Sequence, residues 1–450
     1  MSKKIDFYTN VNIKLQDSAN RSAILNATDR AVNKRDKVVA EIENFEELRE
    51  IANKIKRAVV NNLQINLNKF IENAEKNDFI IHIAKDGDEA KEITHKILSK
   101  HNVKKLVKSK SMVSEEIELN DYLVSKGYQP YETDLGEYII QIAGEKPSHI
   151  TGPAIHKNRK EIAQLFNEKL GMEYTEDPEQ ITAFARKILR EQFLTADAGV
   201  TGGNFLIIED GSFILIENEA NIRLTTTLPP LQISIIGIEK MIPKLTDLST
   251  FLKLLPPSST GQKITGYVNF IRKVNKGKEK HIILLDNNRK SILANKELNS
   301  ALMCIKCGAC ANVCPVFQLV GGHPYDSPYS GSIGIPWTYF LYGEDKIGDL
   351  PYACTLCGAC NEVCPAKINL TDMILEIRHN VADKSLSLEE KGLIKLWSFL
   401  FGNRIINKIS FTIAGYIQYL FAENGKIKNL PLILRKWTGA RDIYKLINRK

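Results

Sequence analysis

The chain has 450 residues, of which 43% are hydrophobic and 25% are charged. This length provides for two or three domains with a large core, and the composition is that of an ordinary globular protein. The first ten residues lack the apolar stretch of a signal peptide, and there is no run of about 18 uncharged apolar residues that could cross a membrane. We therefore expect a cytoplasmic protein, and a peripheral position at the inner face of the membrane stays open.

The net charge of +8 is concentrated at the C-terminal end. Residues 391–450 contain twelve Lys or Arg and two acidic residues, a net charge of +10, which leaves the other 390 residues near −2. Such a basic region suits an acidic partner or an anionic lipid surface, and nucleic acid is not expected. A solvated helical face explains the charge equally well.

Residues 1–70 have a mostly helical pattern, and an α/β pattern follows in residues 71–292. Strands alternate there with helices, which is typical of a largely parallel sheet. The predicted strands are 79–84, 104–108, 128–133 and 138–143, and the predicted helices are 86–101, 114–125 with Ser114 as N-cap, 155–170 and 181–193.

From residue 199 the α/β domain becomes richer in strands. The turn Asp210-Gly211 separates two apolar runs and predicts a hairpin. Because strand-like residues resume after it, the segment 256–259, which begins with two prolines, is interpreted as a loop within the domain. Further strands are predicted at 231–238, 267–271 and 281–285, and residues 286–289 are the expected exit from the domain.

Residues 199–223 carry more polar groups than strands require. A glycine pair before Asn204 is compatible with an anion- or carboxylate-binding loop that also uses Glu217 and Asn221, with Arg223 as a bidentate clamp. Ordinary turn chemistry is the favoured alternative for such a Gly/Asn cluster. No glycine-rich nucleotide fingerprint occurs, no two histidines stand at metal-ligand spacing, and no catalytic residue is identified.

All eight cysteines fall in two runs of the form C-x₂-C-x₂-C-x₃-C-P, the spacing of bacterial ferredoxins with [4Fe–4S] clusters. In two-cluster ferredoxins the fourth Cys of each run ligates the other cluster. Disulfides and zinc sites are disfavoured by the expected compartment and by the spacing. We expect two [4Fe–4S] clusters, one held by Cys304, Cys307, Cys310 and Cys364 and the other by Cys354, Cys357, Cys360 and Cys314.

The 39 residues between the two runs exceed those of a minimal ferredoxin and predict an α-helical ferredoxin domain over residues 293–383, with helices at 337–342 and 372–380. The Gly-rich residues 321–337 either direct backbone N–H groups at cluster sulfur or form an ordinary loop. Residues 384–450 are predicted to be a basic helical region with an apolar stripe from Leu396 to Leu420. The stripe is typical of a docking or core face, with a peripheral membrane helix as the alternative.

Several segments besides the Cys runs carry a family resemblance: Lys108–Met112 with Glu115 and Glu116, Glu132–Tyr138, Pro147–Ile150, Pro153–Lys157, Thr201–Phe205 and Asn218–Arg223. With them, most of the chain resembles the lactate utilisation iron–sulfur protein B family. The resemblance implies an α/β domain of the LUD type, with the fold of ribose-5-phosphate isomerase and CoA-transferase relatives, then an α-helical ferredoxin domain and a helical, family-specific C-terminal region. It also implies a role in oxidising L-lactate to pyruvate in a three-protein complex, whose other members are a cysteine-rich-domain subunit and a second LUD-domain subunit.

Under this interpretation electrons leave lactate at a partner subunit and pass singly through the two clusters to a carrier such as quinone or a cytochrome. The chain is then an electron-transfer subunit and not itself the catalyst. One alternative is an α/β-domain enzyme acting on an acyl or sugar-phosphate substrate, with structural or regulatory clusters. Another is the electron-transfer subunit of a different 2-hydroxy-acid dehydrogenase, of the glycolate type.

Overall fold

The computed structural model describes residues 4–274, 276–385, 388–418, 422–423, 425–427 and 443–444. The chain forms two compact units, residues 1–381 and residues 382–450, called here the N-terminal unit and the C-terminal unit. The N-terminal unit contains both the α/β sheets and the two Cys runs, so the predicted α/β and ferredoxin regions pack together. The domain boundaries expected near residues 70, 292 and 383 stay predictions.

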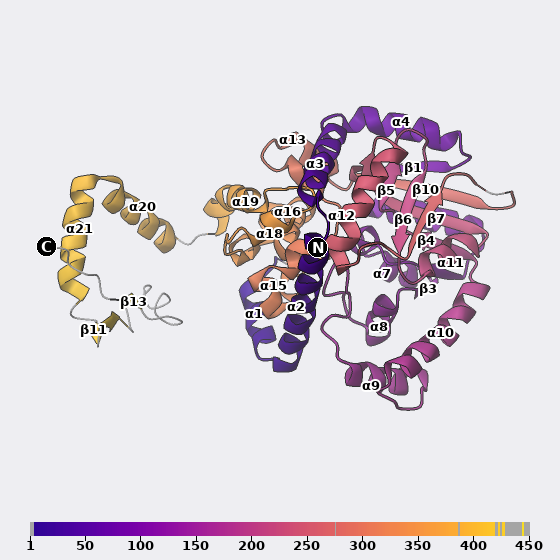
Figure 1. Ribbon diagram of the computed structural model, residues 1–450, viewed down its shortest axis with the longest axis horizontal. Coiled ribbons are helices and arrows are strands. Elements are labelled where there is room, and N and C mark those ends of the chain that lie inside the picture. The colour runs from indigo at the N-terminus through magenta and orange to yellow at the C-terminus, as the bar shows by residue number, and fades with distance from the viewer. Residues whose placement is uncertain are drawn as a thin grey trace. The chain divides into compact units, whose positions relative to one another are not determined.

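A six-stranded parallel sheet forms the centre of the α/β region, in the order β1-β10-β7-β4-β2-β3 (Figure 1). All seven residues of β7 are buried, which explains why this strand is a continuous apolar run and not an alternating one. The predicted strands at 79–84, 104–108, 128–133, 231–238 and 281–285 are confirmed. The strands are β1 (Ile80–Ala84), β2 (Lys105–Lys108), β3 (Gln129–Glu132), β4 (Ala198–Thr201), β7 (Leu231–Gly237) and β10 (Glu279–Leu285).

Helices connect these strands, and several of them begin at a side-chain cap. Asp86 starts α5 by accepting a hydrogen bond from the backbone N–H of Glu89 at 2.9 Å. The predicted helices at 86–101, 155–170 and 181–193 are confirmed. The helices of this region are α5 (Gly87–Lys100), α6 (Met112–Glu116), α7 (Leu119–Ser125), α8 (Leu135–Ala143), α9 (Arg159–Leu170), α10 (Pro178–Thr195), α11 (Asn221–Thr227) and α13 (Arg289–Ala294).

The strand predicted at 138–143 is wrong, because these residues lie in helix α8. Asp134 caps the helix by accepting from the N–H of Glu137 at 3.1 Å, and Gly144 ends it in the left-handed conformation with φ 66°. The apolar residues between these caps have high strand propensity, and the caps together with burial override it.

Ser114 is not an N-cap either. Ser111 caps α6, and Ser114 lies inside that helix. The chain then turns at Glu118, with φ 51°, before α7 begins. The predicted single helix over 114–125 is therefore two short helices with a left-handed residue between them.

A second, smaller sheet has the strand order β8-β5-β6-β9. Its central hairpin pairs Phe205 with Ile214 across the turn at Asp210-Gly211, as predicted. Gly211 has φ 69°, and a Cβ there would lie 2.2 Å from the backbone N of Ala74, so the turn requires glycine. The strands are β5 (Phe205–Ile207), β6 (Phe213–Glu217), β8 (Met241–Ile242) and β9 (Tyr267–Ile271).

The loop predicted at 256–259 is wrong, because Pro256 and Pro257 lie in the last turns of helix α12 (Leu248–Thr260). Each proline removes one helical hydrogen bond. Burial of Leu254, Leu255 and both prolines, with α12 packed on α2 and α3, holds this turn in place.

The first three N-terminal helices lie against the Cys-rich region. The backbone N–H of Phe7 donates to Asp349 at 2.7 Å, the Arg49 guanidinium donates to the carbonyl of Cys364 at 3.0 Å, and the Asn53 amide donates to Ala366 at 2.8 Å. Figure 1 shows α1 and α2 beside α15, in agreement with these contacts. The N-terminal helices are α1 (Phe7–Leu15), α2 (Ser18–Ala40), α3 (Phe45–Asn61) and α4 (Leu63–Glu75).

The Cys-rich region consists of short helices joined by loops, in agreement with a helical ferredoxin-like region. The predicted helices at 337–342 and 372–380 are confirmed, and the first of them begins earlier, inside the Gly-rich segment. The helices are α14 (Ala309–Asn312), α15 (Pro315–Val320), α16 (Gly331–Tyr342), α17 (Glu344–Ile347), α18 (Ala359–Val363) and α19 (Leu370–Ser385), with 3₁₀ turns η3 (Asn299–Met303), η4 (His323–Tyr325) and η5 (Leu350–Ala353).

The C-terminal unit contains helices α20 (Leu388–Gly402) and α21 (Arg404–Ile417) and the short strands β11 (Ala422–Glu423), β12 (Lys426–Ile427) and β13 (Ile443–Tyr444). The predicted apolar stripe falls on both helices, with Asn403 capping the second. Leu420 lies outside the described residues. Ile405 is 71% exposed and Ile413 is 51% exposed, so the stripe does not form a core here. Among the described helices, none combines the length and apolar character needed to span a membrane.

Candidate iron–sulfur site and adjacent cavity

The two Cys runs adopt the same local structure. Each follows a 3₁₀ turn, and the second residue after its first Cys takes a left-handed conformation, with φ 59° at Lys306 and φ 56° at Leu356. This conformation directs the backbone N–H of each of these residues at sulfur, 3.3 Å from the Sγ of Cys304 and of Cys354 respectively. Such N–H groups stabilise negative charge on a ligating thiolate.

The structure brings together four cysteines from both runs in one buried group. Cys304, Cys307 and Cys310 line a cavity whose fourth thiol is Cys364, from the second run. Apolar side chains such as Ile333 complete its wall. The chain therefore collects in one place the four thiols that the ferredoxin pattern predicts for the first cluster, and their identity as iron ligands stays a prediction.

The other four cysteines form a second group nearer the surface. Cys354 and Cys360 have Cys314 as an electrostatic neighbour, and Cys357 lies beside them. Cys357 is exposed, whereas the other group has Cys304 as its most accessible member, and that residue is half-buried. One group is thus enclosed and the other reaches solvent.

These sulfurs fit a cluster better than they fit free thiols. None of the eight is in a disulfide. Burial raises the pKa of Cys364 to about 11 and that of Cys307 well above its usual range, and the charge of neighbouring sulfurs adds to both shifts. Four crowded, buried sulfurs can all be thiolates only if a cation lies among them, and iron supplies that charge.

Cationic side chains surround the first group. Lys56, Lys240 and Lys306 are each electrostatic neighbours of Cys304. The Lys56 ammonium is anchored away from sulfur, because it donates to the carbonyls of Glu239 at 2.5 Å and of Met241 at 3.3 Å. Positive charge here stabilises the thiolate-rich site and raises the reduction potential of any cluster in it.

Hydroxyl groups accompany the second group. The buried Tyr325 hydroxyl is hydrogen-bonded to Cys314, and Ser332 is hydrogen-bonded to Cys360. Both residues belong to the segment between the Cys runs. The prediction for residues 321–337 concerned backbone N–H groups, and the backbone of Ile333 is hydrogen-bonded to Cys310. The two hydroxyls are additional donors from the same segment, and their action on a cluster stays a prediction.

A buried ionic network joins the Cys-rich region to the main sheet. The Arg289 guanidinium binds Glu116 in a bidentate manner, at 2.8 and 3.0 Å, and Glu239 at 2.5 Å, and all three side chains are fully buried. The Tyr329 hydroxyl donates to Glu116 at 2.7 Å, and the Trp337 ring lies 5.0 Å from the guanidinium. Only the tertiary structure brings these residues, from four distant segments, together.

Three of the four residues predicted for a ligand loop line a cavity of about 400 Å³ in the α/β region: Asn204, Glu217 and Asn221. Arg223 is directed elsewhere, since its guanidinium lies 4.6 Å from the Tyr267 ring centre. Both Glu217 oxygens accept hydrogen bonds from the backbone N–H groups that follow, at 2.6 and 3.1 Å. Glu217 thus holds the turn, and ligand binding by the loop stays a prediction.

The same cavity has lysines that sequence analysis did not identify. Its lining includes Lys110, Lys240 and Lys306, and it is called here the lysine cavity. Lys306 and its neighbour Ile305 belong to the first Cys run and also line the cavity with four thiols. One loop therefore separates the two cavities, and no local sequence pattern marks this arrangement.

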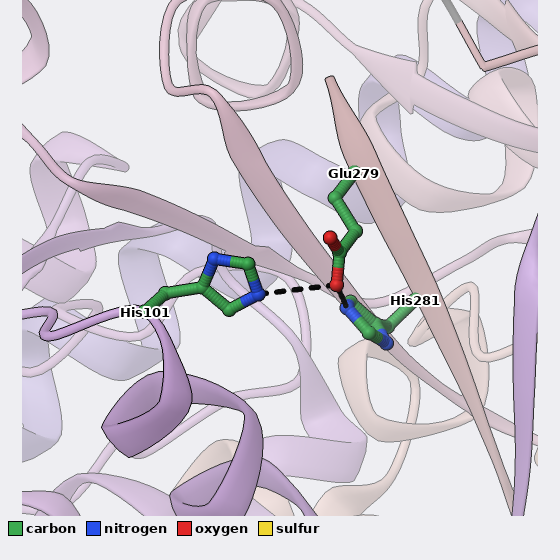
Figure 2. A group of neighbouring side chains, drawn as sticks. All are labelled: His101, Glu279 and His281. Carbon is green, nitrogen blue, oxygen red and sulfur yellow. Dashed lines mark hydrogen bonds and ion pairs between the residues drawn. The ribbon is translucent and has the colours of Figure 1, made fainter. Parts of the chain in front are cut away.

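The fold also gathers histidines that stand far apart in sequence (Figure 2). Glu279 accepts from His101 at 3.1 Å and from His281 at 2.8 Å, and the three ligand atoms lie within 4.8 Å of one another. His82 contacts the other ring nitrogen of His281 at 3.0 Å. The carboxylate and the rings thus satisfy one another by hydrogen bonding, and we assign no metal to them.

Comparison with known proteins extends these observations. The family model of the LUD domain matches residues 67–289, and that of the 4Fe-4S dicluster domain matches residues 300–368. Lactate utilization protein B of Bacillus subtilis (strain 168) is 39% identical over 431 residues, which cover 94% of this chain and 90% of that protein. Lactate utilization protein B of Bacillus cereus (strain B4264) is 40% identical over 452 residues, covering 98% and 95% respectively. A crystal structure of a DUF162 family protein from Deinococcus radiodurans matches 50% of this chain and 98% of its own, with 10% identity and a TM-score of 0.28.

Proposed function

Because the chain belongs to the lactate utilization protein B family, we propose that it is the electron-transfer subunit of a complex that oxidises L-lactate to pyruvate. Its LUD and 4Fe-4S dicluster domains support an iron–sulfur role in lactate utilisation. The proposal adds that two [4Fe–4S] clusters relay the electrons and that a partner subunit oxidises lactate.

The observation that carries this proposal is the division of eight cysteines into a buried and a surface group. We assign Cys304, Cys307, Cys310 and Cys364 to one cluster and Cys314, Cys354, Cys357 and Cys360 to the other. Bound there, each cluster would accept and release single electrons, so a pair matches the two electrons that lactate loses when it becomes pyruvate.

The protein's own residues set the environment of each site. At the buried group, the Lys306 N–H points at the Cys304 sulfur, and apolar side chains such as Ile333 exclude water. At the surface group, the exposed position of Cys357 lets an electron donor or acceptor approach closely. We propose that electrons enter or leave at this surface.

The partners proposed are a cysteine-rich-domain subunit and a second LUD-domain subunit. The C-terminal unit offers them an apolar surface, since Trp397 is 61% exposed and Phe399 is 64% exposed on α20. Large exposed apolar side chains of this kind are typical of protein–protein contacts. The nearby Lys391, Lys395, Arg404 and Lys408 would favour an acidic partner surface.

The test is anaerobic purification of the full chain, iron and sulfide analysis, and EPR after addition of L-lactate, with and without the two partner subunits. About eight irons per chain, and reduction by lactate only with the partners present, are expected. Glycolate is the control substrate, because faster reduction by glycolate would reassign the complex to another 2-hydroxy acid. Clusters that stay oxidised under lactate with both partners present, although dithionite reduces them, would refute the proposal.

A further inference from the structure

The lysine cavity lies at the place in the main sheet where a ligand is expected. Along the sheet, β3 extends to one side of β2, whereas β4, β7 and β10 extend to the other, so the strand order reverses between β2 and β4. Lys110 follows the carboxyl end of β2, Gly202 follows that of β4, and Lys240 follows that of β7. In open parallel sheets, ligands bind outside the carboxyl ends of the strands at such a reversal.

Two of the lysines in this cavity form no hydrogen bond to a carboxylate among the described residues. The Nζ atoms of Lys110 and Lys306 are buried and have no hydrogen-bond partner among the described residues. The Lys306 ammonium instead lies over the Trp337 and Tyr329 rings, 3.3 and 3.9 Å from their centres. Lys240 is 8% exposed and also lines the cavity. Buried ammonium groups are costly unless an anion is bound to them.

A cluster held by the neighbouring thiols would balance only part of the positive charge of these lysines. Lys240 and Lys306 are electrostatic neighbours of Cys304, so the thiolates there balance them in part. Lys110 does not line the cavity with four thiols, and its charge acts on His149, Glu137 and Glu219. A change at Lys110 can therefore distinguish ligand binding in the cavity from neutralisation of the thiolates.

The other side chains of the cavity limit the charge and the kind of ligand. Three acidic residues, Asp134, Glu217 and Glu219, match the three lysines in number. A polyanion would be repelled by these carboxylates, whereas a monoanion can use the lysines. A hydroxyl group on such a ligand can also donate to the acidic side chains. The volume of about 400 Å³ suits a small organic molecule.

We propose that the lysine cavity binds a small organic carboxylate, with its anionic group held by Lys110 and by the Lys240–Lys306 pair. The site is separated from the cavity with four thiols by the Ile305–Lys306 loop, so a bound ligand would lie beside the thiols proposed to hold the buried cluster. The choice of a carboxylate over another monoanion rests on the proposed lactate role. Bound negative charge at this place would lower the reduction potential of a cluster held by those thiols.

The experiment is calorimetric titration of the anaerobically purified holoprotein with L-lactate, pyruvate and inorganic phosphate, in Lys110→Met, Lys240→Met and two control variants. Lys280→Met removes a buried lysine that lines neither cavity, and Lys160→Met removes an exposed one. We expect L-lactate or pyruvate to bind, with a Kd raised at least tenfold by Lys110→Met and Lys240→Met and changed less than twofold by both controls. EPR redox titration is expected to show the potential of one cluster falling on saturation with the carboxylate. Iron content confirms that each variant is loaded.

Three outcomes would overturn the inference: no binding of either carboxylate, tighter binding of phosphate, or unchanged carboxylate affinity in Lys110→Met. These outcomes are distinct from failure of the proposed function. If lactate reduces the clusters through the partners but neither carboxylate binds the isolated chain, the electron-transfer role stands and the cavity inference fails. If carboxylates bind as described but the partners do not deliver electrons, the cavity inference stands and the electron-transfer role fails.

Discussion

Whether each Cys run supplies its fourth cysteine to the cluster of the other run can be tested by removing cysteines in pairs. The structure groups Cys364 with Cys304 although they belong to different runs, and it separates Cys314 from Cys304 although they share one. With about four irons per [4Fe–4S] cluster, Cys304→Ala/Cys364→Ala removes two ligands of the same cluster and should leave about four irons per chain. The matched pair Cys304→Ala/Cys314→Ala removes one ligand from each cluster and should damage both, leaving fewer than about four irons in intact clusters.

The assay is iron and sulfide analysis of the anaerobically purified variants, with EPR of the dithionite-reduced protein to count the remaining cluster signals. One intact signal is expected from the first pair, belonging to the cluster nearer the surface. The opposite result, with iron lost entirely from the first pair and one intact cluster in the second, would show that each run binds its own cluster. It would refute the assignment of Cys364 and Cys304 to one cluster, which rests on the cavity that both line.

Three further predictions concern single residues. Tyr325→Phe removes the hydrogen bond to Cys314. If that bond is stronger by about 1 kcal/mol in the reduced state, its loss should lower the reduction potential of the surface cluster by about 40 mV in an EPR redox titration. An unchanged potential would contradict the hydrogen bond. Arg289→Met leaves Glu116 and Glu239 buried without the guanidinium that pairs with them. The free energy of unfolding should fall by about 3–5 kcal/mol in urea titrations. A loss below about 1 kcal/mol would mean that water reaches these carboxylates. Burial raises the pKa of Glu137 to about 8, so this carboxyl takes up a proton on folding, and its contribution makes the protein less stable as pH rises from about 4.3 towards 8. Glu137→Gln should therefore be more stable than the wild type at pH 8, by a larger margin than at pH 6. An equal gain in stability at both pH values would exclude the raised pKa.

Sequence by itself determined the parts of this protein that depend on local pattern. The continuous apolar runs at β7 and β10 identify buried parallel strands, because strands covered on both faces lack alternation. The apolar run at β1 also forms a strand, but it lies at the edge of the sheet with Ile80 and Ile83 exposed, so burial of that run could not be predicted from its sequence. The Asp210-Gly211 turn identifies its hairpin, because only a few residue types tolerate the dihedral angles it needs. The Cys spacing identifies the 4Fe-4S dicluster domain, since three thiols on one short loop can reach one cluster.

Tertiary structure decided the rest, because competing local preferences are settled by burial. Residues 138–143 have strand propensity and form helix α8, and Pro256 lies within α12 because the surrounding helices bury its turn. The lysine cavity shows the same dependence on long-range contacts. Lys110, Lys240 and Lys306 come from three distant segments, and they meet only because parallel strands end at one edge of the sheet and the first Cys run packs against that edge.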